Sequence, residues 1–195
     1  IDGVFAVGET IAGPHGADRL GGGMISQSCV YGKRTGEKAA SYSSEINSIN
    51  DNHEKIQIRL EKFNNSNGPS YNSIRKELKT LAKDHLIVER NGTGLNFFDN
   101  RINELINEEI TNAPFSGNIR LIKNLETENL LTVARLMVKS AKMRKESRGS
   151  HCRLDYQGID NQSWNKSIFW SLENEKPKYK LSQYRQDPNN IQQIT

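Results

Sequence analysis

Two charged side chains near the start of the chain have the type and placement that ligand binding requires. Glu9 follows a short apolar run, residues 4–7, and Gly8. A carboxylate there can accept hydrogen bonds from hydroxyl groups, because it has two acceptor oxygens and no competing donor. Arg19 lies in a glycine-dense loop, residues 13–23. Its planar guanidinium can hold a carboxylate through two parallel hydrogen bonds.

The elements around these residues form the pattern of a cofactor site. The apolar run predicts a buried strand, and ligands of open α/β sheets bind at the carboxyl ends of strands. The glycines allow positive φ angles and a close approach of the backbone to a ligand. A helix predicted to begin near Gly23 would offer free N–H groups and the positive end of its dipole. The expected cofactor-binding residues are Gly8, Glu9, Gly22, Gly23, Met24 and Ile25.

Two separate segments of the sequence resemble one known family. Residues 1–9 and 15–22, IDGVFAVGE and HGADRLGG, resemble the second FAD-binding segment of the succinate dehydrogenase/fumarate reductase flavoprotein family, typically GLFAVGE and HGANRLGxNSL. Asp18 stands where Asn is usual, and Gly23 and Met24 replace Asn and Ser. Residues 146–156, ESRGSHCRLDY, resemble the family signature ESRGxHxRxD followed by Phe or Tyr. The two motifs occur in the expected order, which makes the resemblance stronger than either motif alone.

The resemblance implies an FAD-dependent oxidoreductase that transfers a hydride between the flavin and a dicarboxylate. Glu9 would bind a ribityl or ribose hydroxyl of FAD, Arg19 would clamp a substrate carboxylate, and the helix from Gly23 would face the pyrimidine edge of the flavin. His15 is a second catalytic candidate. Further candidates for the substrate pocket are Arg148, His151 and Arg153. The family also implies an iron–sulfur partner subunit. Two alternatives stay open: an L-aspartate oxidase-like flavoenzyme, and a non-catalytic helical interaction module.

Several parts of the family's flavoproteins are missing from this sequence. No G-x-G-x-x-G phosphate loop follows a strand, and the family's capping domain and FAD-tethering histidine would lie upstream. The chain also opens on Ile1, in what the resemblance places inside a nucleotide-binding domain. We therefore expect a C-terminal fragment of a longer polypeptide, which alone neither holds FAD tightly nor turns over.

The remaining sequence predicts mainly helices. After a first helix over residues 23–42, apolar residues recur at helical spacing in residues 46–63, 71–85, 95–110 and 126–145. The last of these stretches has Leu130, Leu131, Ala134, Met137, Val138 and Ala141 as its apolar positions. Short turns between helices favour antiparallel neighbours. Two strands are predicted on either side of residues 173–177.

The predicted class is therefore α+β and mostly α, in three parts. Residues 1–43 would be the C-terminal segment of the FAD-binding domain, with its strand, loop and helix. Residues 44–145 would form an antiparallel helical bundle. Residues 146–195 would form a small β and irregular extension that carries the RGxHxRxD motif.

The composition and cysteine spacing exclude several classes of binding partner. The 27 basic and 23 acidic residues give a net charge of +4, and basic residues are not interleaved with aromatic ones, so no nucleic acid is expected. No apolar run approaches the roughly 18 residues that span a bilayer, so no direct membrane insertion is expected. Cys29 and Cys152 lie far apart without metal-ligand spacing, which predicts reduced cysteines and no metal site. We expect a cytoplasmic location, or the cytoplasmic face of a membrane through partner subunits.

Overall fold

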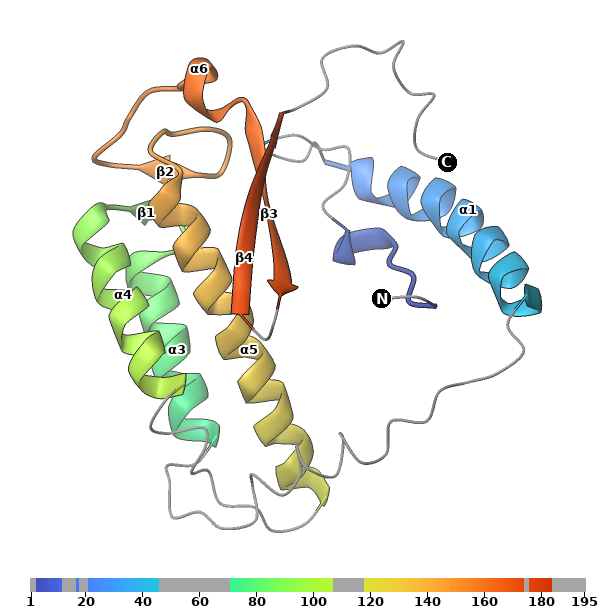
Figure 1. Cartoon of the computed structure of the whole chain (residues 1–195). Coiled ribbons are helices and arrows are strands. Elements are labelled where there is room, and N and C mark those ends of the chain that lie inside the picture. The colour runs from blue at the N-terminus through green and yellow to red at the C-terminus, as the bar shows by residue number, and fades with distance from the viewer. Residues whose placement is uncertain are drawn as a thin grey trace. The chain divides into compact units, whose positions relative to one another are not determined.

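The computed structural model describes residues 3–11, 17, 21–45, 71–106, 118–173 and 176–183. The chain divides into two compact units, Ile1–Ile56 and Gln57–Thr195. Figure 1 shows the elements of both. The stretch expected to form a helix over residues 46–63 lies outside the described residues.

The first unit contains the 3₁₀ turn η1, Gly8–Thr10, and the helix α1, Gly23–Glu45. The predicted helix start at Gly23 is confirmed. The buried strand predicted for residues 4–7 is wrong for this chain: Val4 is 66% exposed, and these residues belong to no strand. The backbone is extended at Val7, with φ −154° and ψ 161°. A strand is stable only when neighbours satisfy its backbone and cover its faces, and the described residues of this unit include no strand with which residues 4–7 could pair.

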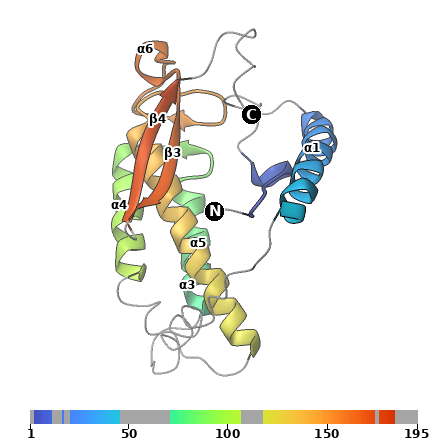
Figure 2. The same cartoon turned by 45° about the vertical axis from the view of Figure 1, so that its right-hand side comes forward.

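The second unit is built on three helices, α3 (Tyr71–His85), α4 (Gly92–Glu104) and α5 (Asn118–Met143). Figures 1 and 2 show α3 and α4 lying along α5. Their facing sides form one apolar core. Its buried members are Ile74, Leu78, Leu81, Leu86, Leu95, Phe98, Ile102, Leu105, Leu131, Ala134, Val138 and Ala141. The helical stripes predicted for α3 and α4 are therefore confirmed.

Two details of the helices differ from the prediction. Helix α5 begins at Asn118 rather than near residue 126. Leu130 and Met137, predicted as apolar positions of this helix, are 41% and 53% exposed. Successive residues of a helix turn by about 100°, so the face that carries Leu131, Ala134, Val138 and Ala141 turns Leu130 and Met137 away from the core.

Helix α4 begins with a capping residue, Asn91. The Asn91 side chain accepts a hydrogen bond of 2.8 Å from the amide of Gly94, and the backbone of Asn91 is extended. Asn is among the preferred residues at this capping position, because its side chain satisfies an amide that has no partner within the helix.

Two small sheets complete the second unit. Strands β1 (Glu89–Arg90) and β2 (Cys152–Arg153) pair in parallel. Strands β3 (Lys166–Glu173) and β4 (Lys176–Gln183) form an antiparallel hairpin, with Trp170 opposite Tyr179. The two predicted C-terminal strands are thus confirmed, although Trp164 ends the short helix α6 (Asn161–Trp164) instead. The Trp170 indole N–H donates to Ser140 Oγ at 2.8 Å, which anchors the hairpin on α5.

None of the helices that the structure describes has the length and hydropathy that a bilayer-spanning segment needs.

Candidate functional site

In the first unit, the turn that carries Glu9 is held against the beginning of α1. The carbonyl of Gly8 accepts hydrogen bonds from the Ile11 amide at 3.2 Å and from the Gln27 side-chain amide at 3.4 Å. Gln27 is only 5% exposed, the one buried residue of α1. Gly8 has a φ of +71°, a conformation that L residues with a Cβ rarely adopt. The exposed Glu9 therefore sits in a turn whose position relative to the helix is fixed.

The other expected cofactor-binding residues lie where the chain enters α1. Gly22 has a φ of +81°, and its carbonyl accepts a hydrogen bond of 3.1 Å from the Ile25 amide. A Cβ added at Gly21 or Gly22 would meet nothing within 4 Å, so this backbone is open to a ligand. Met24 is half-buried and Ile25 is 72% exposed. The structure thus brings the turn at Gly8 and the start of α1 together, and the contact of these residues with FAD stays a prediction. Arg19 and His15 lie outside the described residues.

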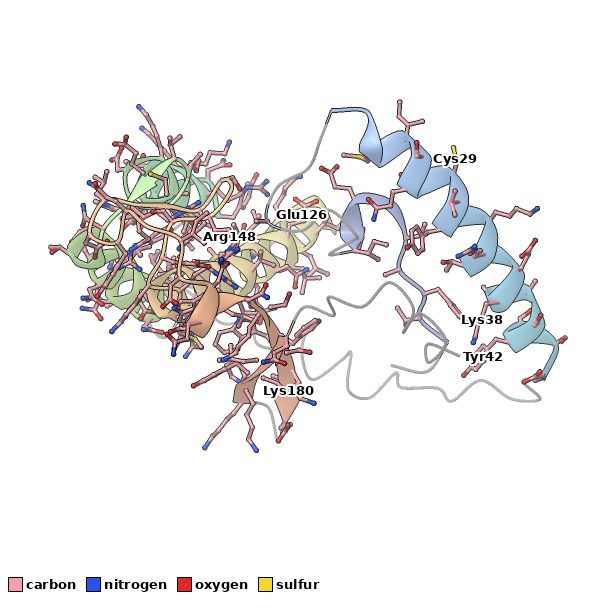
Figure 3. The ribbon with its side chains drawn as sticks, turned by 90° about the horizontal axis from the view of Figure 1, so that it is seen from above. Cys29, Lys38, Tyr42, Glu126, Arg148 and Lys180 are labelled. Carbon is pink, nitrogen blue, oxygen red and sulfur yellow. The ribbon has the colours of Figure 1, made fainter. Side chains whose placement is uncertain are left out.

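In the second unit, the signature segment that follows α5 is organised by a buried carboxylate. Glu146 has no exposed surface and accepts hydrogen bonds from Arg144 at 2.5 Å, from Arg148 at 2.9 and 3.0 Å, and from the Asp160 amide at 2.9 Å. Burial acts to raise the pKa of Glu146, but the hydrogen bonds from Arg148, Asp160 and Arg144 outweigh it and lower that pKa. Figure 3 labels Arg148, whose second partner is the Asn161 side chain at 2.8 Å.

Arg153 connects the end of α5 with the start of α4. Its guanidinium is 3% exposed and holds both oxygens of Asp155 at 2.8 Å, while Nη1 donates to the Ala141 carbonyl at 2.7 Å. Asp155 also accepts a hydrogen bond from the Gly92 amide at 2.9 Å. The hydrogen bonds from Arg153 lower the pKa of Asp155 to about 2. A cation at a helix C-terminus and an anion at a helix N-terminus both stabilise the helices they face.

His151 is fixed between two arginine residues. The turn from Arg148 to His151 is closed by reciprocal backbone hydrogen bonds of 2.9 and 3.0 Å, with Gly149 at a φ of +55°. Nε2 of His151 lies 3.1 Å from the Arg144 carbonyl, and Nδ1 lies 3.1 Å from Nη1 of Arg90. A carbonyl only accepts and a guanidinium only donates, so Nε2 carries the proton and the imidazole is neutral. Burial, with Arg90, Arg144 and Arg153 nearby, lowers the pKa of His151.

The described part of the signature is therefore a set of ion pairs that closes one end of the helical unit. The guanidinium groups of Arg148 and Arg153 each form an ion pair with a carboxylate of the same unit. His151 lines a groove. Contact of these three side chains with a substrate stays a prediction. Arg90 was not among the residues predicted from the sequence. Its only distinguishing feature in the sequence is its position just before Asn91, the capping residue of α4. Among the described residues, no group of three or more His, Cys, Asp or Glu is placed to hold a metal ion.

The neutral state of His151 predicts a pH dependence of stability. The folded-state pKa of His151 lies below the ordinary 6.5, so the unfolded chain binds more protons than the folded chain as pH falls below 6.5. The folded state therefore has its full stability above pH 6.5 and loses stability as pH falls toward the lowered pKa. The variant His151→Gln removes the titration. We expect its free energy of urea unfolding to depend less on pH between 7 and 5, by up to about 1.4 kcal/mol per pH unit. An unchanged slope would contradict the neutral assignment.

Comparison with known proteins assigns the chain to a family. Residues 75–194 match the family model described as "Fumarate reductase flavoprotein C-term". This match covers more than half of the chain, so the chain belongs to the succinate dehydrogenase/fumarate reductase flavoprotein family, and the predicted family and fold class are confirmed.

Individual relatives agree with this assignment. The chain is 38% identical over 160 residues to an uncharacterized FAD-dependent oxidoreductase of Methanocaldococcus jannaschii, a match that covers 80% of this chain and 29% of the relative. It is 31% identical over 194 residues to the fumarate reductase flavoprotein of Haemophilus influenzae, with coverage of 93% and 32%. The solved FrdA chain of E. coli quinol fumarate reductase superposes with a TM-score of 0.80 at 26% identity, covering 92% of this chain and 33% of that one. The chain thus spans about a third of the length of these proteins.

Proposed function

We propose that this chain is the C-terminal part of an FAD-dependent oxidoreductase that transfers a hydride between its flavin and a dicarboxylate of the fumarate and succinate type. The observation that carries the proposal is the family match over residues 75–194, which includes the whole signature segment. The first unit supports it independently, because the turn at Gly8 and the start of α1 lie together where the resemblance requires a flavin site.

The described residues fit a bound FAD. The backbone at Gly21 and Gly22 is open, and a 23-residue helix begins directly after it. When bound, FAD supplies the hydride acceptor or donor. The exposed carboxylate of Glu9 would accept hydrogen bonds from its hydroxyl groups. The start of α1 would favour negative charge on the flavin by roughly 0.3–1 kcal/mol, and up to ~2 kcal/mol in a buried setting. Since ~1.4 kcal/mol corresponds to about 30 mV for a two-electron couple, this helix tunes the flavin's potential modestly.

The substrate would be held by side chains of the glycine-dense loop. Arg19 would bind one carboxylate of the dicarboxylate in a bidentate manner, and His15 would donate a hydrogen bond to a substrate oxygen or hold the loop. A solved structure similar to this chain carries the name quinol fumarate reductase. We propose an iron–sulfur partner subunit for electron exchange with this protein, at the cytoplasmic face of a membrane.

The test is the colour and redox chemistry of the complete polypeptide that carries this sequence. We expect it to purify with visible flavin absorbance, and its reduced flavin to be reoxidised by fumarate under anaerobic conditions. The 195-residue chain by itself should bind added FAD weakly and show no turnover. A colourless complete polypeptide would overturn the proposal. Reoxidation by oxygen with L-aspartate as the reductant, without any response to fumarate, would favour the aspartate oxidase alternative.

A further inference from the structure

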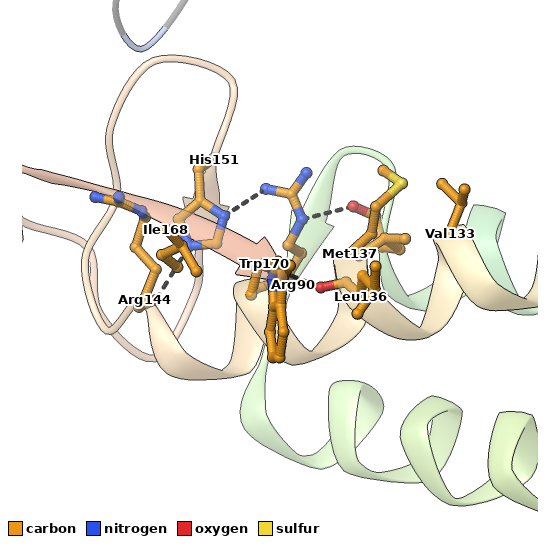
Figure 4. A pocket seen from close by; sticks show the side chains of 11 residues that line it. Arg90, Val133, Leu136, Met137, Arg144, His151, Ile168 and Trp170 are labelled. Carbon is orange, nitrogen blue, oxygen red and sulfur yellow. Dashed lines mark hydrogen bonds between the residues drawn. The ribbon is translucent and has the colours of Figure 1, made fainter. Parts of the chain in front are cut away.

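The second unit contains a groove that neither the flavin nor the dicarboxylate proposal uses. It has a volume of about 380 Å³. Its walls come from α5, strand β3, the segment 86–90 that follows α3, and the turn at His151. Figure 4 shows Arg144 and His151 at one end and Val133 at the other, with Arg90 between them. The apolar lining comes from Leu86, Val133, Leu136, Met137, Ile168 and Trp170. The groove is thus apolar along most of its length, and its basic side chains, Arg90 and Arg144, lie in the part nearer His151.

Arg90 is a charged side chain of the groove whose hydrogen-bond partners are all neutral. Its guanidinium donates to the carbonyls of Leu86 at 2.5 Å, Ser150 at 3.2 Å and Ile87 at 3.4 Å, and to His151 at 3.1 Å. All four acceptors are neutral. Within the part of the chain that the structure describes, no carboxylate pairs with Arg90, and none of the groove-lining residues is acidic. By contrast, Arg144, also in the lining, pairs with Glu146.

This uncompensated charge is partly removed from water. Burial lowers the pKa of Arg90 and is the largest cause of that shift. A guanidinium in such surroundings gains more from a carboxylate than an exposed one does, because the attraction between charges grows as water is excluded. Nη2 makes only the long 3.4 Å contact with Ile87, so this nitrogen is the donor best placed to meet an incoming acid.

The apolar part of the groove continues along the surface of α5. Val133 and Met137 line the groove and are 54% and 53% exposed, and Leu130, one turn before Val133, is 41% exposed. Together these side chains form an apolar stripe on the face of α5 that turns away from the core. A small molecule in the groove would leave most of this stripe in water, whereas an extended segment of polypeptide would cover it.

We propose that this groove is a docking site for a polypeptide segment that presents an apolar side chain next to a carboxylate. The apolar side chain is buried between Trp170 and Met137, and the carboxylate meets the Arg90 guanidinium. Residues on either side of this pair lie along the stripe from Met137 to Leu130. The segment is recognised by this combination, since the described lining of the groove offers an apolar surface and, in Arg90, a cation that no described carboxylate pairs with.

The experiment uses the full 195-residue chain labelled with ¹⁵N and the synthetic peptide SGLEFDGS, with its neutral counterpart SGLQFNGS as the matched control. The two tryptophan indole signals provide the readout, because Trp170 lines the groove and Trp164 does not. We expect the acidic peptide to shift the Trp170 signal saturably and the Trp164 signal little. Its affinity should be about twofold to fivefold higher than that of the neutral peptide, the range of one favourable charge pair at a partly exposed site.

Two variants and one control test whether the acidic peptide binds in the groove beside Arg90. Arg90→Gln should abolish the preference for the acidic peptide. Because Arg90 also donates to three carbonyls, a second variant leaves Arg90 in place. Met137→Glu adds a negative charge in the exposed wall of the groove and should weaken binding of the acidic peptide about twofold to fivefold. Ile122→Glu places the same charge on the same helix, at a 54% exposed position outside the groove, and should leave binding unchanged.

Three outcomes would overturn the proposal. They are no shift of Trp170 at millimolar peptide, equal affinity of the acidic and neutral peptides, and loss of binding in Ile122→Glu to the same extent as in Met137→Glu. A further arm uses 4-phenylbutyrate, which carries an apolar body and a free carboxylate. If this compound binds as tightly as the peptide, the groove is a small-molecule site and its assignment to a polypeptide is wrong.

Discussion

The variant Arg19→Lys of the complete polypeptide is expected to lose about a hundredfold in kcat/KM for fumarate or succinate. Arg19 is proposed to hold a substrate carboxylate through two parallel hydrogen bonds, whereas a lysine ammonium is a point charge that cannot reproduce this planar fork. Misplacement of a substrate by about 1 Å can cost about 10²-fold in rate, which corresponds to roughly 2.7 kcal/mol of transition-state stabilisation.

Steady-state kinetics and flavin content together test this prediction. Flavin content should stay at the level of the unchanged protein, because Arg19 is assigned to the substrate and not to FAD. The matched control is Arg34→Lys, the same substitution at an exposed position of α1. It should leave kcat/KM unchanged. Full activity of Arg19→Lys toward dicarboxylates would remove Arg19 from the site, and loss of flavin would reassign it to the cofactor.

The variant Glu146→Gln should lower the free energy of unfolding of the second unit by about 3 kcal/mol at pH 7. Glu146 is fully buried and is shared by Arg144 and Arg148, whose side chains are only 16% and 20% exposed. Removing the negative charge leaves two guanidinium groups in a poorly solvated position without a carboxylate, and breaking a buried pair in this way typically costs about 3–5 kcal/mol. The lower end applies here because both arginines retain some contact with water.

Urea unfolding followed by tryptophan fluorescence isolates this effect. The two tryptophans of the chain, Trp164 and Trp170, both lie in the second unit, so their signal reports on that unit. The matched control is Glu104→Gln. Glu104 also bonds an arginine, Arg101 at 2.9 Å, but its side chain is 55% exposed. Exposed ion pairs contribute about 0–1 kcal/mol, so this change should be small. Equal losses in the two variants would show that Glu146 does not organise the segment.

The helices of the second unit were largely predictable, and so was the family. Apolar residues spaced three and four apart identified α3 and α4. These signals are local, since a helix satisfies its own backbone hydrogen bonds and needs only one apolar face. The segment from Glu146 to Tyr156 was singled out by its resemblance to the family, which the comparison confirmed.

The predictions that failed depended on neighbours distant in the sequence. Residues 4–7 have the composition of a buried strand, yet a strand is completed only by other strands, and none lies beside them among the described residues. Likewise, Met137 is as apolar as Val138, and only the side on which α3 and α4 pack decides that one is exposed and the other buried.

The sequence by itself determined that α1, α3, α4 and most of α5 are helices, and which family the chain belongs to, because each of these depends on the order of residues along the chain. Only the tertiary structure decided the partners of the charged side chains. Arg153 bonds Asp155 and the end of α5, and Glu146 joins Arg144 to Arg148. Arg90, some 60 residues earlier, meets His151 at the end of an apolar groove. Side-chain charges act over a few ångströms in space, so their pairing follows from packing and not from sequence spacing.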